Sequence, residues 1–116
     1  MNQSINYHGK RFRSVANVAS GDVGADTFFD YYQQGNLVWA DYSGGSVRKG
    51  QLIAVADEAG NLDMRYQHVD QAGRLKTGIC SSRPEIMPGG GLRLHESWQW
   101  TCDDRSRGTS IIEQVP

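Results

Sequence analysis

Apolar and polar residues alternate along much of this chain with a period of two. The alternation is clearest in two segments. Between positions 61 and 70, one face carries Leu62, Met64, Tyr66 and His68. Between 92 and 101, one face carries Leu92, Leu94, Glu96, Trp98 and Trp100. This pattern is typical of β-strands with one face buried.

The same alternation, less regular, recurs at 10–16, 27–33, 37–42, 47–56, 74–82 and 108–114. Short turn sequences at 34–36, 44–45, 58–61 and 71–73 separate these segments and contain glycine, which tolerates the positive φ of tight hairpins. Only 83–91, with two prolines and three consecutive glycines, is long enough for a loop that crosses a barrel end or forms a lid. No stretch of ten residues has a helical stripe, which excludes parallel βαβ units.

The sequence therefore predicts an all-β fold of about eight short antiparallel strands in an up-and-down meander. So many strands must hide their edges, and closure into a barrel does this while leaving an interior for side chains or one small ligand. We expect a barrel with little or no helix, and a two-sheet sandwich is the alternative. The barrel is one domain over 1–116, with 1–9 as a flexible N-terminal segment.

Composition limits the class of partner. The 116 residues include 38% hydrophobic and 22% charged residues, which indicates one folded domain rather than a disordered chain. Twelve basic and thirteen acidic residues give a net charge of -1, so we expect neither nucleic acid nor a membrane as partner. The N-terminus has no basic leader or long apolar stretch, from which we expect a cytoplasmic protein. Cys80 and Cys102 are then expected as free thiols, with a disulfide as the alternative.

Four stretches of the chain carry a resemblance to a known family: 36–45, 49–53, 63–67 and 92–100. They resemble short bacterial proteins that are often labelled N-acetylglutamate synthase and that look avidin-like or calycin-like in fold. The similarity covers residues 11–113. The resemblance implies a β-barrel, and it brings no established active-site residues.

The residues can be compared with what that label requires. Acetyl transfer from acetyl-CoA in the common acyltransferase fold needs a glycine-rich loop that leads into a helix N-terminus and binds the pyrophosphate. Here the glycines at 89–91 lead into the strand pattern that begins at Leu92. The residues therefore favour a non-enzymatic binding protein, and a small enzyme such as an acyltransferase is the alternative.

Polar residues on otherwise apolar faces are the candidates for function. Glu96 lies between Leu94 and Trp98 in the period-two pattern, and a carboxylate that points inward must be paired or hydrogen-bonded. We predict a pocket for a small, partly apolar ligand, lined by Tyr31, Trp39, Met64, Tyr66, Glu96 and Trp98. The alternative is a filled barrel whose buried polar network fixes the strand register.

No catalytic residue, metal or cofactor is predicted. An enzyme would use Glu96 as general base, assisted by His68 or Tyr66. A zinc site would need His68 and His95 together, but they belong to separate segments and His95 lies on the face opposite Glu96. A third hypothesis is an interaction protein that forms a homodimer through a barrel face.

Overall fold

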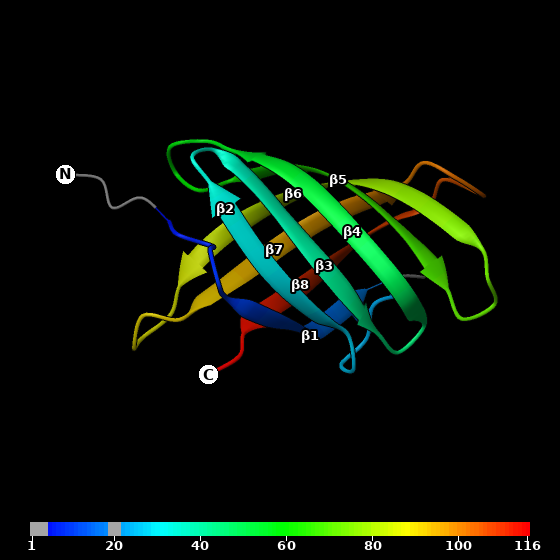
Figure 1. Cartoon of the computed structure of the whole chain (residues 1–116), viewed down its shortest axis with the longest axis horizontal. Helices are drawn as coiled ribbons and strands as arrows, with labels where there is room; N and C mark the ends of the chain where they lie inside the picture. Colours follow the sequence, from blue (N-terminus) through cyan, green and yellow to red (C-terminus); the bar gives the residue numbers. More distant parts are fainter. Residues whose placement is uncertain (1–4, 19–21) are drawn as a thin grey trace.

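The computed structural model describes residues 5–18 and 22–116, and every regular element in these ranges is a β-strand (Figure 1). The strands are β1 (Arg11–Val18), β2 (Phe28–Gln34), β3 (Leu37–Gly44), β4 (Val47–Ala56), β5 (Leu62–Asp70), β6 (Leu75–Ile86), β7 (Leu92–Trp100) and β8 (Arg107–Gln114). The described residues contain no helix that is long and apolar enough to cross a membrane.

Each strand pairs antiparallel with the next, and β1 pairs with β8 to close the barrel. In the closing pair, Phe12 lies opposite Gln114 and Ser14 opposite Ile112, before the register shifts between Ser14 and Ala16. An extra residue of this kind bends a strand and increases its twist, as closure requires. The predicted up-and-down barrel is confirmed, and the sandwich alternative is wrong.

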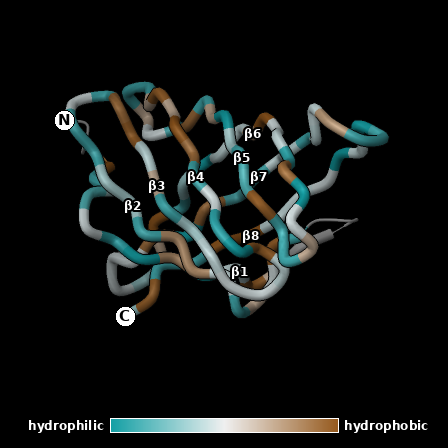
Figure 2. Tube along the Cα trace, turned by 45° about the vertical axis from the view of Figure 1, so that its right-hand side comes forward, coloured by the Kyte–Doolittle hydropathy of each residue, from teal (hydrophilic) through white to brown (hydrophobic). Residues whose placement is uncertain are grey.

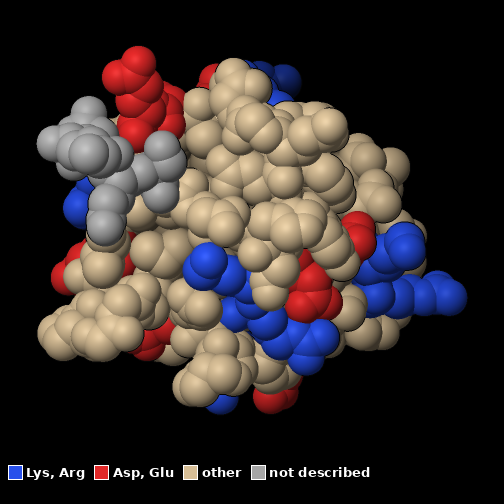
Figure 3. All heavy atoms as spheres, turned by 60° about the vertical axis from the view of Figure 1, so that its left-hand side comes forward, with Lys and Arg blue, Asp and Glu red and all other residues tan. Residues whose placement is uncertain are grey.

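Hydrophobic and hydrophilic residues alternate along the strands (Figure 2), and burial follows this alternation. On β7, the side chains of Leu92, Leu94, Trp98 and Trp100 are buried, whereas those between them are more exposed. Outside, basic and acidic side chains are interspersed on the face shown in Figure 3, in keeping with a net charge of -1.

The N-terminal segment closes one end of the barrel. Of the segment predicted to be flexible, residues 1–4 lie outside the described residues, but residues 5–9 do not form a free tail. The Tyr7 side chain is fully buried, its ring centroid lies 5.8 Å from that of Tyr31, and its hydroxyl donates to the carbonyl of Gly60. The Tyr7 amide also donates to Gln33 Oε1 at 2.8 Å. The sequence prediction failed here because so short a segment shows no periodic pattern.

The prediction of a long loop at 83–91 is wrong. Strand β6 continues to Ile86 opposite β7, and a tight turn follows in which the Met87 amide donates to the Gly91 carbonyl at 2.8 Å. Pro84 fits in this strand because the pairing of β6 with β5 ends at Ser82. Beyond that point β6 has one neighbour only, so the missing N–H of proline costs little.

Two glycines inside strands make room for tyrosine rings in the interior. Gly50 lies opposite Tyr42, and Gly78 lies opposite Tyr66. A Cβ atom at either glycine would overlap the ring of its partner. The absence of a side chain therefore lets both rings lie flat against the neighbouring strand.

We expect Gly50→Ala to lower the free energy of unfolding by about 1–3 kcal/mol, because the buried Tyr42 ring must move to admit the added methyl group. Urea denaturation measures this. The control is Gly91→Ala, whose Cβ would meet nothing nearer than Gln114 Oε1 at 4.0 Å and which should change stability by less than about 0.5 kcal/mol. Equal effects of the two variants would contradict the assignment of Gly50 as a space for Tyr42.

Candidate functional site

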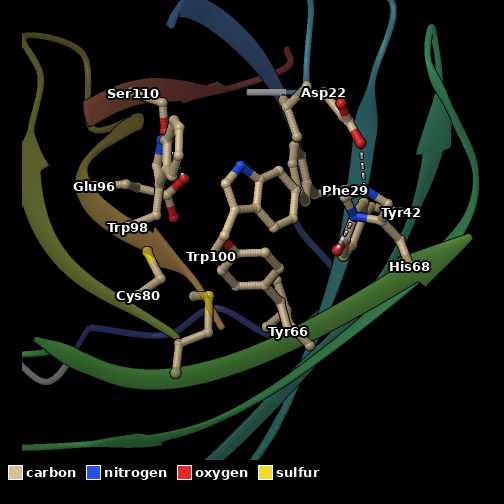
Figure 4. Close-up of a pocket in the computed structure, with 13 residues that line it drawn as sticks. Asp22, Phe29, Tyr42, Tyr66, His68, Cys80, Glu96, Trp98, Trp100 and Ser110 are labelled. Carbon is tan, nitrogen blue, oxygen red and sulfur yellow. Dashed lines mark hydrogen bonds and ion pairs between the residues drawn. The ribbon is translucent and has the colours of Figure 1, made fainter. Parts of the chain in front are cut away.

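A cavity of about 50 Å³ lies inside the barrel, at the end away from Tyr7 (Figure 4). A water molecule needs at least about 10–15 Å³ of such space, so this cavity holds a few waters or a small chemical group. Seven of the eight strands contribute to its wall. The lining residues are Asp22, Val23, Phe29, Tyr42, Leu52, Met64, Tyr66, His68, Cys80, Glu96, Trp98, Trp100 and Ser110.

Aromatic rings form a large part of the wall. The ring centroids of Trp98 and Trp100 are 5.9 Å apart with an interplanar angle of 61°, and those of Tyr66 and Trp100 are 5.7 Å apart at 65°. These edge-to-face arrangements are the favoured geometry for aromatic pairs. They hold the rings in place, so the wall is formed before any ligand enters.

Glu96 places a carboxylate in this apolar surrounding. Its side chain points towards the interior, in the direction of Trp100 (Figure 4), and the Ser110 hydroxyl donates to Glu96 Oε1 at 3.3 Å. The register of β6, β7 and β8 places Ser82, Glu96 and Ser110 in one row. Burial raises the pKa of Glu96 to about 7, against the opposing effect of the neighbouring hydroxyls.

Two buried hydroxyl groups close to Glu96 lack a hydrogen-bond partner among the described residues. They are Tyr31 Oη and Ser82 Oγ, on side chains that are 1% and 2% exposed. The Ser82 hydroxyl faces the Glu96 carboxylate across the ladder, but no hydrogen bond of normal geometry joins them. Buried polar groups almost always have a partner, so a water molecule or a ligand group is expected there.

A chain of polar contacts lies at the mouth of the cavity. Tyr42 Oη is 2.9 Å from His68 Nδ1, and His68 Nε2 is 3.0 Å from Asp22 Oδ2. The Lys76 ammonium donates to the same Asp22 oxygen at 2.9 Å and lies 5.2 Å from the centre of the Trp100 ring. Asp70 continues the chain, 3.6 Å from Lys76 Nζ.

These contacts balance the buried charges at the mouth. Burial works against the charged form of Asp22, but the hydrogen bonds from His68 and Lys76 outweigh it and lower the pKa of this carboxyl group. The pKa of Lys76 is raised, chiefly by its hydrogen bond to Asp22. Because Asp22 lies between β1 and β2, the network ties that connection to β5 and β6.

A family model described as avidin-like protein matches residues 5–115, which is nearly the whole chain. The chain belongs to the avidin-like family. No curated protein and no solved structure matches it.

This avidin-like barrel brings four of the six predicted ligand-binding residues to one cavity: Met64, Tyr66, Glu96 and Trp98. Tyr31 also points inward, but it packs against Tyr7 and Phe12 beyond the cavity. That these residues bind a ligand stays a prediction.

Trp39 does not face the interior, and its predicted place in the pocket wall is wrong. In β3 the inward side chains are Val38, Ala40 and Tyr42, so Trp39 lies outside and stacks on Tyr32 with ring centroids 5.8 Å apart. The prediction followed the apolar character of tryptophan instead of the alternation in this strand.

The side chains considered for metal binding or catalysis either lie apart from one another or already contact other partners. His95 lies on the outer surface, 2.8 Å from Glu85, and the described residues contain no group of three potential metal ligands. Both ring nitrogens of His68 contact polar partners. Cys80 and Cys102 are free, and burial raises the pKa of the Cys80 thiol, which keeps it protonated.

Several cavity residues were missed at the sequence level. Trp100 shares the face of Glu96 and Trp98, so its position was available from the alternation alone. Ser110 could be found only with the register of β8 against β7. Asp22 had no local signal, because its contact to His68 joins positions 46 residues apart.

We expect Glu96→Gln to become more stable relative to wild type as pH rises. The folded-state pKa of about 7 exceeds the unfolded value of 4.5, so the native state holds the proton more tightly and loses stability as pH rises from 4.5 to 7. The glutamine side chain has no such loss. Between pH 5 and pH 8, the stability of the variant relative to wild type should therefore rise by about 2–3 kcal/mol.

Urea unfolding at the two pH values measures this difference. Glu58→Gln, at an exposed turn position, is the matched control and should follow wild type at both. Asp22 does not contribute to the pH dependence of stability in this range, because its lowered pKa keeps it ionised until conditions are more acidic. A stability difference for Glu96→Gln that is the same at pH 5 and pH 8 would show that the carboxylate is solvated.

Proposed function

We propose that this protein binds a small, partly apolar molecule in the interior of its barrel and does not change it chemically. The observation that carries the proposal is the interior cavity, whose partly aromatic wall holds the Glu96 carboxylate inside and the Asp22 carboxylate at the mouth. Small-molecule sites commonly combine an apolar lining with a few convergent polar groups. Here Glu96 and Ser110 are those groups inside the cavity.

The contrast between the two ends of the barrel supports this proposal. At the closed end Tyr7, Phe12 and Tyr31 pack ring against ring and fill the interior. At the other end there are more aromatic side chains, yet they surround free space. Membership in the avidin-like family is consistent with a small-ligand binder.

The available groups offer less support for an enzyme. Glu96 could accept a proton, but His68 is held between Tyr42 and Asp22, and the Cys80 thiol stays protonated. The glycines at 89–91 lie at the turn before β7, so no helix N-terminus follows to bind a pyrophosphate. Binding needs none of these groups to react.

The test is a thermal-shift screen of the purified protein against small metabolites, including biotin, acetyl-CoA and glutamate. A ligand that binds the folded state stabilises it by mass action, by about 2.7 kcal/mol at a hundredfold excess over Kd. The melting temperature rises as a result. Cys80→Leu places a larger side chain in the cavity and should abolish the shift.

Ser81→Leu is the matched control, because it adds the same side chain on the outer face of β6 and should leave the shift unchanged. A shift that survives Cys80→Leu would place the ligand elsewhere. A screen in which no compound stabilises the wild-type protein would favour the filled-barrel alternative.

The homodimer stays a prediction, and one feature of the outer surface favours it. Apolar side chains are exposed on neighbouring strands: Ile53 is 57% and Val55 is 55% exposed on β4, and Leu37 on β3 lies opposite Val55. Trp39 lies opposite Ile53 and extends the same patch. Exposed apolar clusters of this kind are typical of association surfaces.

We expect wild type to elute as a dimer and Ile53→Lys as a monomer when light scattering follows size-exclusion chromatography. The substitution adds a charge at an exposed position, so the folded barrel should tolerate it. A monomeric wild-type protein would contradict the prediction.

A further inference from the structure

We propose that the cavity takes a small organic cation, namely a primary amine on a short apolar group, whose ammonium pairs with Glu96. This inference rests on the proposed binding function and names the chemical class of its ligand. Three features of the described residues carry it.

The first feature is the missing countercharge of Glu96. The buried carboxylate of Asp22 lies 2.9 Å from Lys76 Nζ, and that of Asp70 lies 3.0 Å from Arg74 Nε. Within the described ranges Glu96 has no basic side chain in ion-pair distance, and the polar groups beside it are the neutral hydroxyls of Ser110 and Ser82. A buried charge without a partner is costly, so the site favours a ligand that supplies the opposite charge.

The second feature is the ring wall. Aromatic faces attract cations within about 6 Å of the ring centroid, and the attraction increases when water is excluded. Lys76 already uses this attraction at the mouth, where its ammonium lies 5.2 Å from the centre of the Trp100 ring. Trp98 and Trp100 also line the interior, where a ligand ammonium at Glu96 would lie among them.

The third feature is that a small primary amine matches the cavity both in size and in its hydrogen-bond donors. The cavity of about 50 Å³ admits a small group and excludes a large one. A primary ammonium has three N–H donors, and the Glu96 carboxylate and the Ser110 hydroxyl offer acceptors side by side. The unpartnered Ser82 hydroxyl, next to Glu96 across the ladder, is a further acceptor.

The groups around Glu96 define how binding should depend on pH. The titratable groups that surround it are phenols and a thiol: Tyr7, Tyr31, Tyr42, Tyr66 and Cys80. Burial raises the pKa of each, so all stay neutral between pH 6 and pH 8. The charged groups at the mouth are Asp22, Asp70, Lys76 and, when protonated, His68. Glu96 itself, with a pKa of about 7, gains its charge across this range.

The experiment compares amines with neutral molecules of the same shape. Titration calorimetry measures the binding of methylamine and ethylamine, and of methanol and ethanol, at pH 8, because molecules of this size match a cavity of about 50 Å³. We expect each amine to bind at least about tenfold more tightly than its alcohol, and about tenfold more weakly at pH 6 than at pH 8, following the charge of Glu96. Both amines stay protonated throughout.

Two variants identify the group responsible. Glu96→Gln keeps the shape of the site, removes its charge and should abolish both the preference for amines and the pH dependence. A pH dependence that remains in this variant would assign it to the mouth residues and overturn the role given to Glu96. Glu58→Gln removes a carboxylate at an exposed turn and should bind as wild type does.

Other results overturn the inference in distinguishable ways. If the alcohols bind as tightly as the amines, or Glu96→Gln retains the preference, the cavity binds small molecules without selecting cations. The inference of a cationic ligand is then wrong, and the proposed function stands. If no amine binds, the inference of a cationic ligand is also wrong. The proposed function fails with it only when no compound in the metabolite screen stabilises the protein.

Discussion

Closure of the sheet between β1 and β8 is the constraint on which the rest of this structure depends. Once every strand has two neighbours, each side chain points either into the barrel or out of it, and a shift of one residue would reverse a whole strand. The interior is narrow, and bulky rings fill it unevenly. Tyr7, Phe12 and Tyr31 close one end, whereas Trp98 and Trp100 surround a cavity at the other. The site is therefore a consequence of how a closed barrel is packed.

The pairing of glycine with tyrosine explains how so many rings fit beside this cavity. Each of Gly50 and Gly78 leaves a space on its own strand into which the ring from the neighbouring strand lies flat. Tyr42 reaches His68 from this position, and Tyr66 reaches Trp100. The glycines thus set the shape of the wall although they contribute no atom to its chemistry. The same packing holds the mouth network in place, because His68 in turn contacts Asp22.

The fold could be predicted from the sequence because alternation and closure are local and geometric rules. The clean pattern in β7 placed Glu96 and Trp98 on the inner face, and the structure agrees. Trp39 was misplaced because hydrophobicity was weighed above alternation in β3. The closed end depends on Tyr7 contacting Gly60 and Tyr31, which are distant in sequence. Contacts of this kind follow from register and loop paths, and one sequence read alone does not contain them.

Stability and binding are linked through one carboxylate. Ionised Glu96 lowers the stability of the folded chain, because the charge is buried without a cation among the described residues. A filled barrel would gain stability from an apolar residue at this position, so the carboxylate costs free energy that the fold alone does not recover. A ligand cation offsets that cost, because pairing removes the penalty that ionisation imposes. Part of the binding free energy would then come from removing the cost of burying ionised Glu96, which the empty barrel already carries. The pH range in which ionised Glu96 destabilises the free protein is also the range in which such a ligand binds most tightly.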